Sequence, residues 1–383
     1  MSGSVRRCVR RFHGAAALAG ALAGIAACAP TPPRAQSITP RSAPAQTSGS
    51  LDDALRARAE RATDRDAAPS RRGSVIVSEE DWTYAGRAGR IITTPHFRIH
   101  TTVKRSLLLD RTPDFAELAL ASYRSALGDL PEPGARLDTF VMHSRAEWES
   151  ITRSIAGDQA PTYLRIPRGG FALGGKGVYY DIGPRDTLSI AAHEGWHQYT
   201  QATFRHPLPL WLEEGIAAYF EGFRWDRADR TLPVFLPWSN PQRFDTLRDA
   251  VAEDKLMPLR EILVSRPQDL LERTDGRALV YYAQVWALAH FLREGAGAKY
   301  REPLARLLLD AAEGRLFGEL AQQIGQRNAR RTLGRRVGDG VFRAYFTDDL
   351  DTAQREYEQF IRAATLPGTR GDMTAGRSPL END

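Results

Sequence analysis

The chain of 383 residues predicts an α+β fold, in which a mixed sheet with helices precedes a mainly helical region. Two observations predict it. Short segments of alternating apolar and polar residues, such as His96–His100, lie in the first half of the chain. Longer apolar segments with helical spacing, such as Leu279–Leu292 and Pro303–Ala312, lie in the second half.

The predicted elements of the first half are, in order, a strand at His96–His100, a helix at Asp114–Leu127 behind Pro113, a strand at Leu137–His143 and a hairpin or edge strand at Phe171–Asp181. An edge strand can pair with an extended peptide or simply end the sheet, and the pattern allows both. We expect one domain at about residues 74–365, with an N-terminal α/β subdomain to about residue 222 and a helical subdomain from about residue 223.

The N-terminus has the layout of a bacterial export signal. Arg6, Arg7, Arg10 and Arg11 precede an uncharged apolar stretch that ends in Ile25-Ala26-Ala27-Cys28. These last four residues resemble a lipobox, which predicts cleavage after residue 27 and a lipid anchor on Cys28. The alternatives are an ordinary signal peptide and an uncleaved anchor. Because Ala29 and not aspartate follows Cys28, lipoprotein sorting habits favour the outer membrane, with the domain facing the periplasm.

The cysteine count and the charge agree with this prediction. The chain has two cysteines, Cys8 inside the signal and Cys28, so the processed chain has none left for a disulfide or a metal. Processing removes four arginines and no acid, which lowers the net charge from +5 to +1. The basic balance of the whole chain therefore gives no support for nucleic-acid binding.

Both flanks of the domain lack the apolar content that a core needs. Residues 28–73 are rich in proline, alanine, serine and threonine, which predicts a disordered tether. Residues 366–383 are polar and glycine-rich, which predicts a disordered tail.

The most informative motif is His193-Glu194-Gly195-Trp196-His197. On a helix, His193 and His197 leave the same face and can bind one zinc ion, while Glu194 reaches a water beside the metal. A chance match is the alternative. The surrounding residues are apolar, however, and histidine and glutamate are poor choices for a buried helix unless they are paired or bound to metal.

A catalytic zinc usually holds three protein ligands and one water. The next apolar segment, which begins Trp211-Leu212-Glu213-Glu214-Gly215, can supply the third ligand, and we expect it to be Glu214. Glu221 lies seven residues later on the same helical face. It is either a partner that orients a ligand or a charge at the end of the helix, and we favour the charge.

These two segments resemble the gluzincin zinc peptidases, and most closely the peptidase MA-like branch, which is distantly similar to aminopeptidase N and thermolysin. The resemblance implies a zincin-like fold and a third ligand at Glu214 rather than Glu213. The sixteen residues between His197 and Glu214 are about two fewer than in the aminopeptidases, a difference that a loop can absorb. The resemblance is strong over residues 187–222.

A second stretch, Tyr281-Tyr282-Ala283-Gln284, resembles the helix that carries the oxyanion-stabilising tyrosine of aminopeptidase N-like enzymes. The resemblance implies that Tyr282 has this catalytic role, and a phenol can donate a hydrogen bond to a developing oxyanion. The alternative is a core stripe at helical spacing.

Together these observations predict a lipid-anchored zinc metallopeptidase of the cell envelope, with a peptide or protein substrate. The aminopeptidase signature that recognises a free substrate N-terminus is absent, so exopeptidase action is not expected. Two alternatives stay open: a non-catalytic zincin-fold lipoprotein that binds or scaffolds, and a zinc hydrolase of cell-wall peptide crosslinks. The intact Glu194 argues against the scaffold, which does not need that acid.

Overall fold

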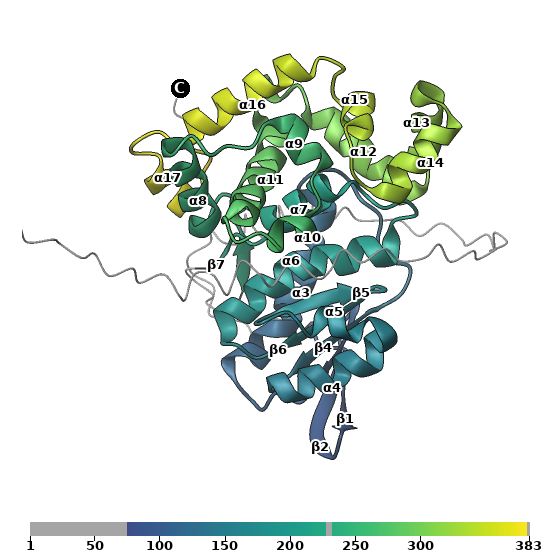
Figure 1. The fold of residues 1–383 in the computed structure, drawn as a ribbon. Helices are drawn as coiled ribbons and strands as arrows, with labels where there is room; N and C mark the ends of the chain where they lie inside the picture. The colour runs from purple at the N-terminus through teal and green to yellow at the C-terminus, as the bar shows by residue number, and fades with distance from the viewer. Residues whose placement is uncertain (1–74, 227–231, 381–383) are drawn as a thin grey trace, which may run out of the picture. The chain divides into compact units, whose positions relative to one another are not determined.

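The computed structural model describes residues 75–226 and 232–380. Within these ranges the protein is mixed α+β, with an N-terminal sheet followed by a mainly helical region (Figure 1), which confirms the predicted class. The predicted signal, Cys28 and tether lie outside the described residues. No helix of the described ranges combines the length and the apolar character that a membrane span requires.

The sheet has six strands and mixed pairing. Across the sheet they are β1 (Ser78–Tyr84), β2 (Arg87–Thr93), β3 (Phe97–Thr101), β4 (Leu137–Met142), β6 (Lys176–Tyr180) and β5 (Gly170–Leu173). The strands β3, β4 and β6 are parallel, whereas β1, β2 and β5 each run antiparallel to a neighbour. The predicted hairpin therefore forms, and its first strand, β5, is an edge of the sheet.

The hairpin β1–β2 was not predicted. Its first strand reads Ser-Glu-Glu-Asp-Trp-Thr-Tyr and buries none of its residues, so it carries no continuous apolar face. Pairing with β2 holds it in the sheet, and Trp82 and Tyr84 also pack against the core.

The first helix, α3 (Leu107–Ser125), begins seven residues before the predicted start. Ser106 caps it by accepting a hydrogen bond from the backbone N–H of Leu109, and Leu108 and Leu109 are buried. Pro113 lies inside the helix, although proline usually ends one. Burial of the first turn offsets the hydrogen bond that Pro113 cannot donate.

Helices cover both faces of the sheet. Successive residues of β6 show this, because Val178 packs with Trp148 of α4 (Arg145–Ala156) on one face. Tyr179 packs with α3 and α6 (Pro184–Thr203) on the other. Beyond α6 lie α7 (Leu210–Tyr219) and α11 (Arg277–Glu294), so α6 separates the sheet from the helical region.

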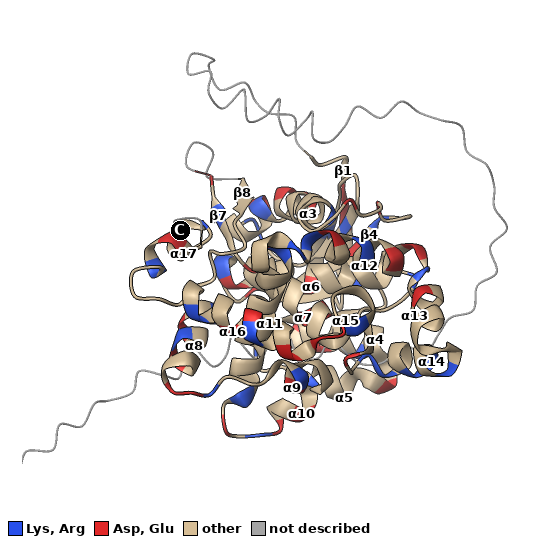
Figure 2. Ribbon diagram, turned by 90° about the horizontal axis from the view of Figure 1, so that it is seen from above, with Lys and Arg blue, Asp and Glu red and all other residues tan. Residues whose placement is uncertain are grey.

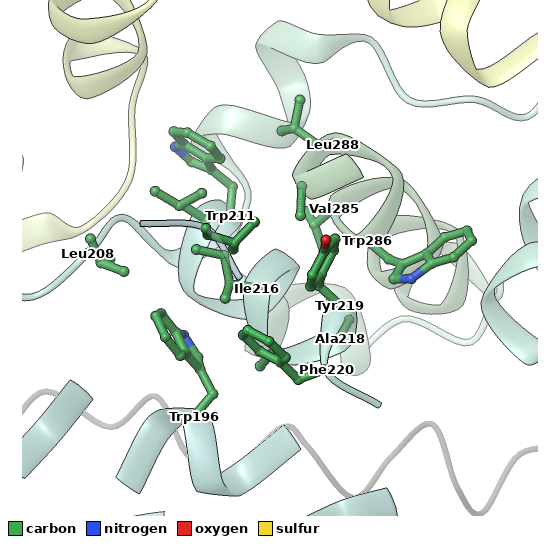
Figure 3. Packing of buried hydrophobic residues seen from close by; sticks show 14 of the residues in the cluster. Trp196, Leu208, Trp211, Ile216, Ala218, Tyr219, Phe220, Val285, Trp286 and Leu288 are labelled. Carbon is green, nitrogen blue, oxygen red and sulfur yellow. The ribbon is translucent and has the colours of Figure 1, made fainter. Parts of the chain in front are cut away.

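The contact between α7 and α11 is close and largely apolar (Figure 3). Tyr219 of α7 lies beside Val285 and Trp286 of α11. Gly215 permits the approach, because a Cβ atom there would lie 2.5 Å from the carbonyl oxygen of Val285. This contact fixes the helix that carries Glu213 and Glu214 against the C-terminal region.

The C-terminal region is helical apart from one small hairpin, β7 (Phe223–Trp225) and β8 (Pro233–Phe235). Its remaining helices are α8 (Pro241–Ala252), α9 (Leu259–Val264), α10 (Pro267–Leu271), α12 (Arg301–Glu313), α13 (Leu316–Ile324), α14 (Gln326–Arg335), α15 (Gly340–Tyr345), α16 (Leu350–Ala364) and α17 (Arg370–Ala375). Basic and acidic residues are interspersed along these helices (Figure 2).

The last helix corrects the predicted disordered tail. Residues 366–380 are structured, and Met373 of α17 is fully buried. The Arg370 guanidinium donates to both carboxylate oxygens of Asp245 on α8, at 3.1 and 2.9 Å. The prediction failed because the segment has too few apolar residues to show a pattern. Burial of Met373 and Pro379, packing of Leu380 and the ion pair with Asp245 hold it on the domain.

We expect Gly215→Ala to destabilise the protein by about 1–3 kcal/mol, because the added methyl would collide with a backbone oxygen that cannot move alone. Thermal or urea unfolding measures the change. Gly334→Ala is the matched control, since a Cβ atom there meets nothing within 4 Å in α14. It should be neutral or stabilising by about 0.5–1 kcal/mol. Equal stability of the two variants would contradict the close-approach argument.

Candidate metal centre

Two helices bring three potential ligands together. His193 and His197 lie one turn apart on α6, and Glu214 lies on α7. Their ligand atoms are all within 4.8 Å of one another, and all three residues are buried. The Glu214 Oε2 atom lies 3.5 Å from Nε2 of His193 and 3.8 Å from Nε2 of His197.

The chemistry of this group is compatible with a metal site. Two imidazole nitrogens and one carboxylate oxygen converge, and the Nε2 atom of His197 has no hydrogen-bond partner among the described residues. Buried polar atoms are normally satisfied, and a cation held by the group would satisfy the His197 nitrogen. The structure thus groups the three residues that the sequence analysis proposed as ligands.

Each histidine is oriented by a carboxylate on its other ring nitrogen. The Nδ1 atom of His193 lies 2.9 Å from Glu221, and the Nδ1 atom of His197 lies 2.9 Å from Glu213. A histidine that donates from Nδ1 presents the lone pair of Nε2. With Nδ1 beside a carboxylate, each ring turns its Nε2 atom toward Glu214, which is the orientation that a metal ligand needs.

The role of Glu221 corrects the sequence analysis, which favoured a simple charge at the helix end. The helix α7 ends at Tyr219, and the chain that follows carries the Glu221 carboxylate to His193. Burial would raise the pKa of Glu221, but Arg243 and His193 outweigh it and hold that pKa well below its usual range. A charge at a helix end would be solvated, whereas this one is enclosed and paired.

The function of Glu213 was missed. Its carboxylate does not join the three converging ligand atoms and lies on the Nδ1 side of His197 instead, because adjacent helical side chains point about 100° apart. It accepts from His197 and, at 2.8 Å, from the Thr200 hydroxyl. The signal in the sequence was the Glu-Glu pair inside an apolar helix, since only one of two neighbouring acids can face one site.

A second layer of polar groups surrounds Glu221. The Arg243 guanidinium of α8 donates to both carboxylate oxygens, at 2.7 and 3.1 Å, and the Asn240 amide donates at 2.7 Å. Arg243 is itself buried. No pattern in the sequence identified either residue, because Asn240 caps α8 and Arg243 lies in its first turn, and only the fold brings this end of α8 to the chain that follows α7.

Glu194 is fully buried and is not one of the three grouped residues. Burial raises its pKa to about 7, while the neighbouring His197 and His193 oppose that rise. The backbone of Ala172 in the edge strand β5 also opposes it. Glu194 therefore lies between the two histidines and the sheet edge.

Tyr282 is buried on α11, and its ring lies 5.2 Å from the Arg243 guanidinium. The structure thus links Tyr282 to the groups around His193 through Arg243. Both its predicted oxyanion role and the alternative of core packing are consistent with this position.

The comparisons with known proteins cover part of the chain. A family model described as "Protein of unknown function (DUF1570)" matches residues 187–314. No curated protein matches the chain. The matched segment contains the three grouped residues, Glu194 and Tyr282, and ends before α13.

Proposed function

We propose that the protein is a zinc-dependent hydrolase of peptide bonds with a zincin-like fold. The observation that carries the proposal is the buried convergence of His193, His197 and Glu214, with Glu194 on the same helix as the two histidines. Two histidines and one carboxylate form a ligand set typical of catalytic zinc, which keeps a fourth position open.

When bound, zinc would supply a Lewis acid that polarises the scissile carbonyl and makes a water more acidic. Glu194 would take a proton from the attacking water and pass it to the leaving amine. Tyr282 would donate to the oxyanion.

One observation favours a second candidate. His193, Glu194, His197 and Glu214 are at most 3% exposed. A metal enclosed in this way could serve a non-catalytic envelope module whose metal only stabilises the fold. The two candidates differ in what they require of Glu194, since a structural metal does not need a base.

We further propose that the protein is anchored in the cell envelope through lipid on Cys28, with the domain in the periplasm. The support is the sequence Ile25-Ala26-Ala27-Cys28 behind a basic and then apolar segment. A peptide crosslink of the cell wall would be an accessible substrate there, as would an unfolded protein.

We expect the wild type to bind one zinc ion per chain, and His193→Ala, His197→Ala and Glu214→Ala to lose it, because two remaining ligands make a poor site. Metal analysis of the dialysed proteins measures this. Glu213→Gln is the matched control: it should keep the metal with an affinity about 10–100-fold lower, since only an orienting partner changes. Stoichiometric zinc in His193→Ala would disprove the ligand set.

Glu194→Gln should fold, keep zinc and lose about 10²–10⁴-fold in hydrolytic rate, because glutamine keeps the size of glutamate but cannot accept the proton. Cleavage of a denatured protein and of peptidoglycan fragments gives the rate, and melting temperature with and without chelator shows whether zinc is bound. If wild type and Glu194→Gln are equally inactive while both bind zinc, the structural-metal candidate is the better one.

Cys28→Ser should abolish lipidation and release the protein from membranes, because the serine hydroxyl cannot form the thioether. Incorporation of labelled fatty acid and membrane flotation measure the two effects. Absence of label in the wild type would indicate an ordinary signal or an uncleaved anchor instead.

A further inference from the structure

The helix α7 is held at its N-terminal end by Arg336. Its first backbone N–H groups have no side-chain cap, since Pro209 precedes the helix. The Arg336 carbonyl accepts from Leu210 N–H at 2.8 Å, and the Arg336 Nε donates to the Leu208 carbonyl at 2.9 Å. The same guanidinium lies 3.8 Å from Glu213.

Arg336 makes these contacts from an unusual backbone conformation. It follows α14 with φ of 56°, in the left-handed region that favours glycine. Arginine at this position costs free energy that glycine would not. The contacts of its side chain with Leu208 and Glu213 offset this free-energy cost. They explain why an arginine occupies a position where the backbone conformation favours glycine.

The segment that follows α7 is held by Arg243. Its guanidinium binds Glu221 through two nitrogens, as the planar fork of arginine allows and a lysine does not. Arg243 is 6% exposed, and a buried cation requires such a partner. The contact is therefore specific for both the charge and the shape of arginine.

We propose that Arg243 and Arg336 are positioning residues of the metal centre, which act through Glu221 on His193 and through Glu213 on His197. The inference rests on the proposed metal site. A carboxylate that is anchored by arginine holds its imidazole in one orientation, and a free carboxylate does not. Neither arginine touches the grouped ligand atoms, so their effect is on the geometry and affinity of the site.

The two arginines come from different parts of the helical region. Arg243 lies on α8, and Arg336 lies at the end of α14, beyond the matched family segment. The C-terminal region thus completes a site whose grouped residues all precede it. The contact of Arg243 is the shorter, so its loss should have the larger effect.

The test uses the processed chain, with zinc affinity measured by chelator competition and the cobalt-substituted protein measured by visible absorption. Arg243→Gln should lower zinc affinity about 10–100-fold and shift the cobalt bands, because the His193 ring is no longer held. Arg243→Lys keeps the charge but not the fork, and should recover part of the affinity. If Arg243→Gln does not fold, the zinc affinity of Arg243→Lys still tests the proposal.

Arg336→Gly isolates the second guanidinium, since glycine accepts the left-handed backbone and keeps the carbonyl that binds Leu210. We expect a smaller loss of affinity, of about tenfold or less. Arg370→Gln is the matched control, because it removes an ion pair to Asp245 on α8, the helix that carries Arg243. It should leave zinc affinity and the cobalt spectrum unchanged.

The outcomes separate this inference from the proposed function. If the Arg243 and Arg336 variants fold and keep the zinc affinity and cobalt spectrum of the wild type, the positioning role is overturned. The proposed metal centre is then unaffected. A wild type that binds neither zinc nor cobalt would overturn the metal centre itself. An equal loss in Arg370→Gln would show that the effect is general destabilisation, which also overturns the inference.

Discussion

The structure depends on one constraint: charged and imidazole groups are enclosed between α6 and α7, where water cannot satisfy them. Removing an ion from water is costly unless it is paired, so every such group needs a partner from the protein or a metal. The pairs His193–Glu221 and His197–Glu213 meet that requirement on one side of the rings. On the other side, the Nε2 atoms face Glu214, and a cation there would complete the pairing.

The sequence could predict those features that depend on residues close together in the chain. The His193 and His197 spacing is local, because one helix turn places both on one face. The apolar segment indicated an acid as the third ligand, and the choice of Glu214 over Glu213 came from the resemblance to gluzincins. The strands β3 and β4 alternate between buried and less buried residues over most of their length, so their sequences predicted strands. These features depend on neighbours in the sequence, and periodicity reports such neighbours.

The parts that could not be predicted depend on contacts across the fold. Glu221 looks like a charge at a helix end until Arg243 is brought to it, and Arg336 resembles any other arginine of α14. The strand β1 and the helix α17 lack an apolar pattern and are held by pairing and a few contacts. A single sequence contains no periodic signal for an ion pair between distant residues.

The candidate site combines residues from early and late parts of the chain, which has a consequence for biosynthesis. A chain emerges N-terminus first, so the histidines and Glu214 are complete well before residue 336 has been made. Metal ligands that are not yet held in place bind weakly, and metal binding is coupled to folding. If the proposed site binds a metal, the chain would hold it tightly only after the C-terminal helices have docked. If the proposed export signal is used as well, the metal would enter the site after the chain has crossed the membrane.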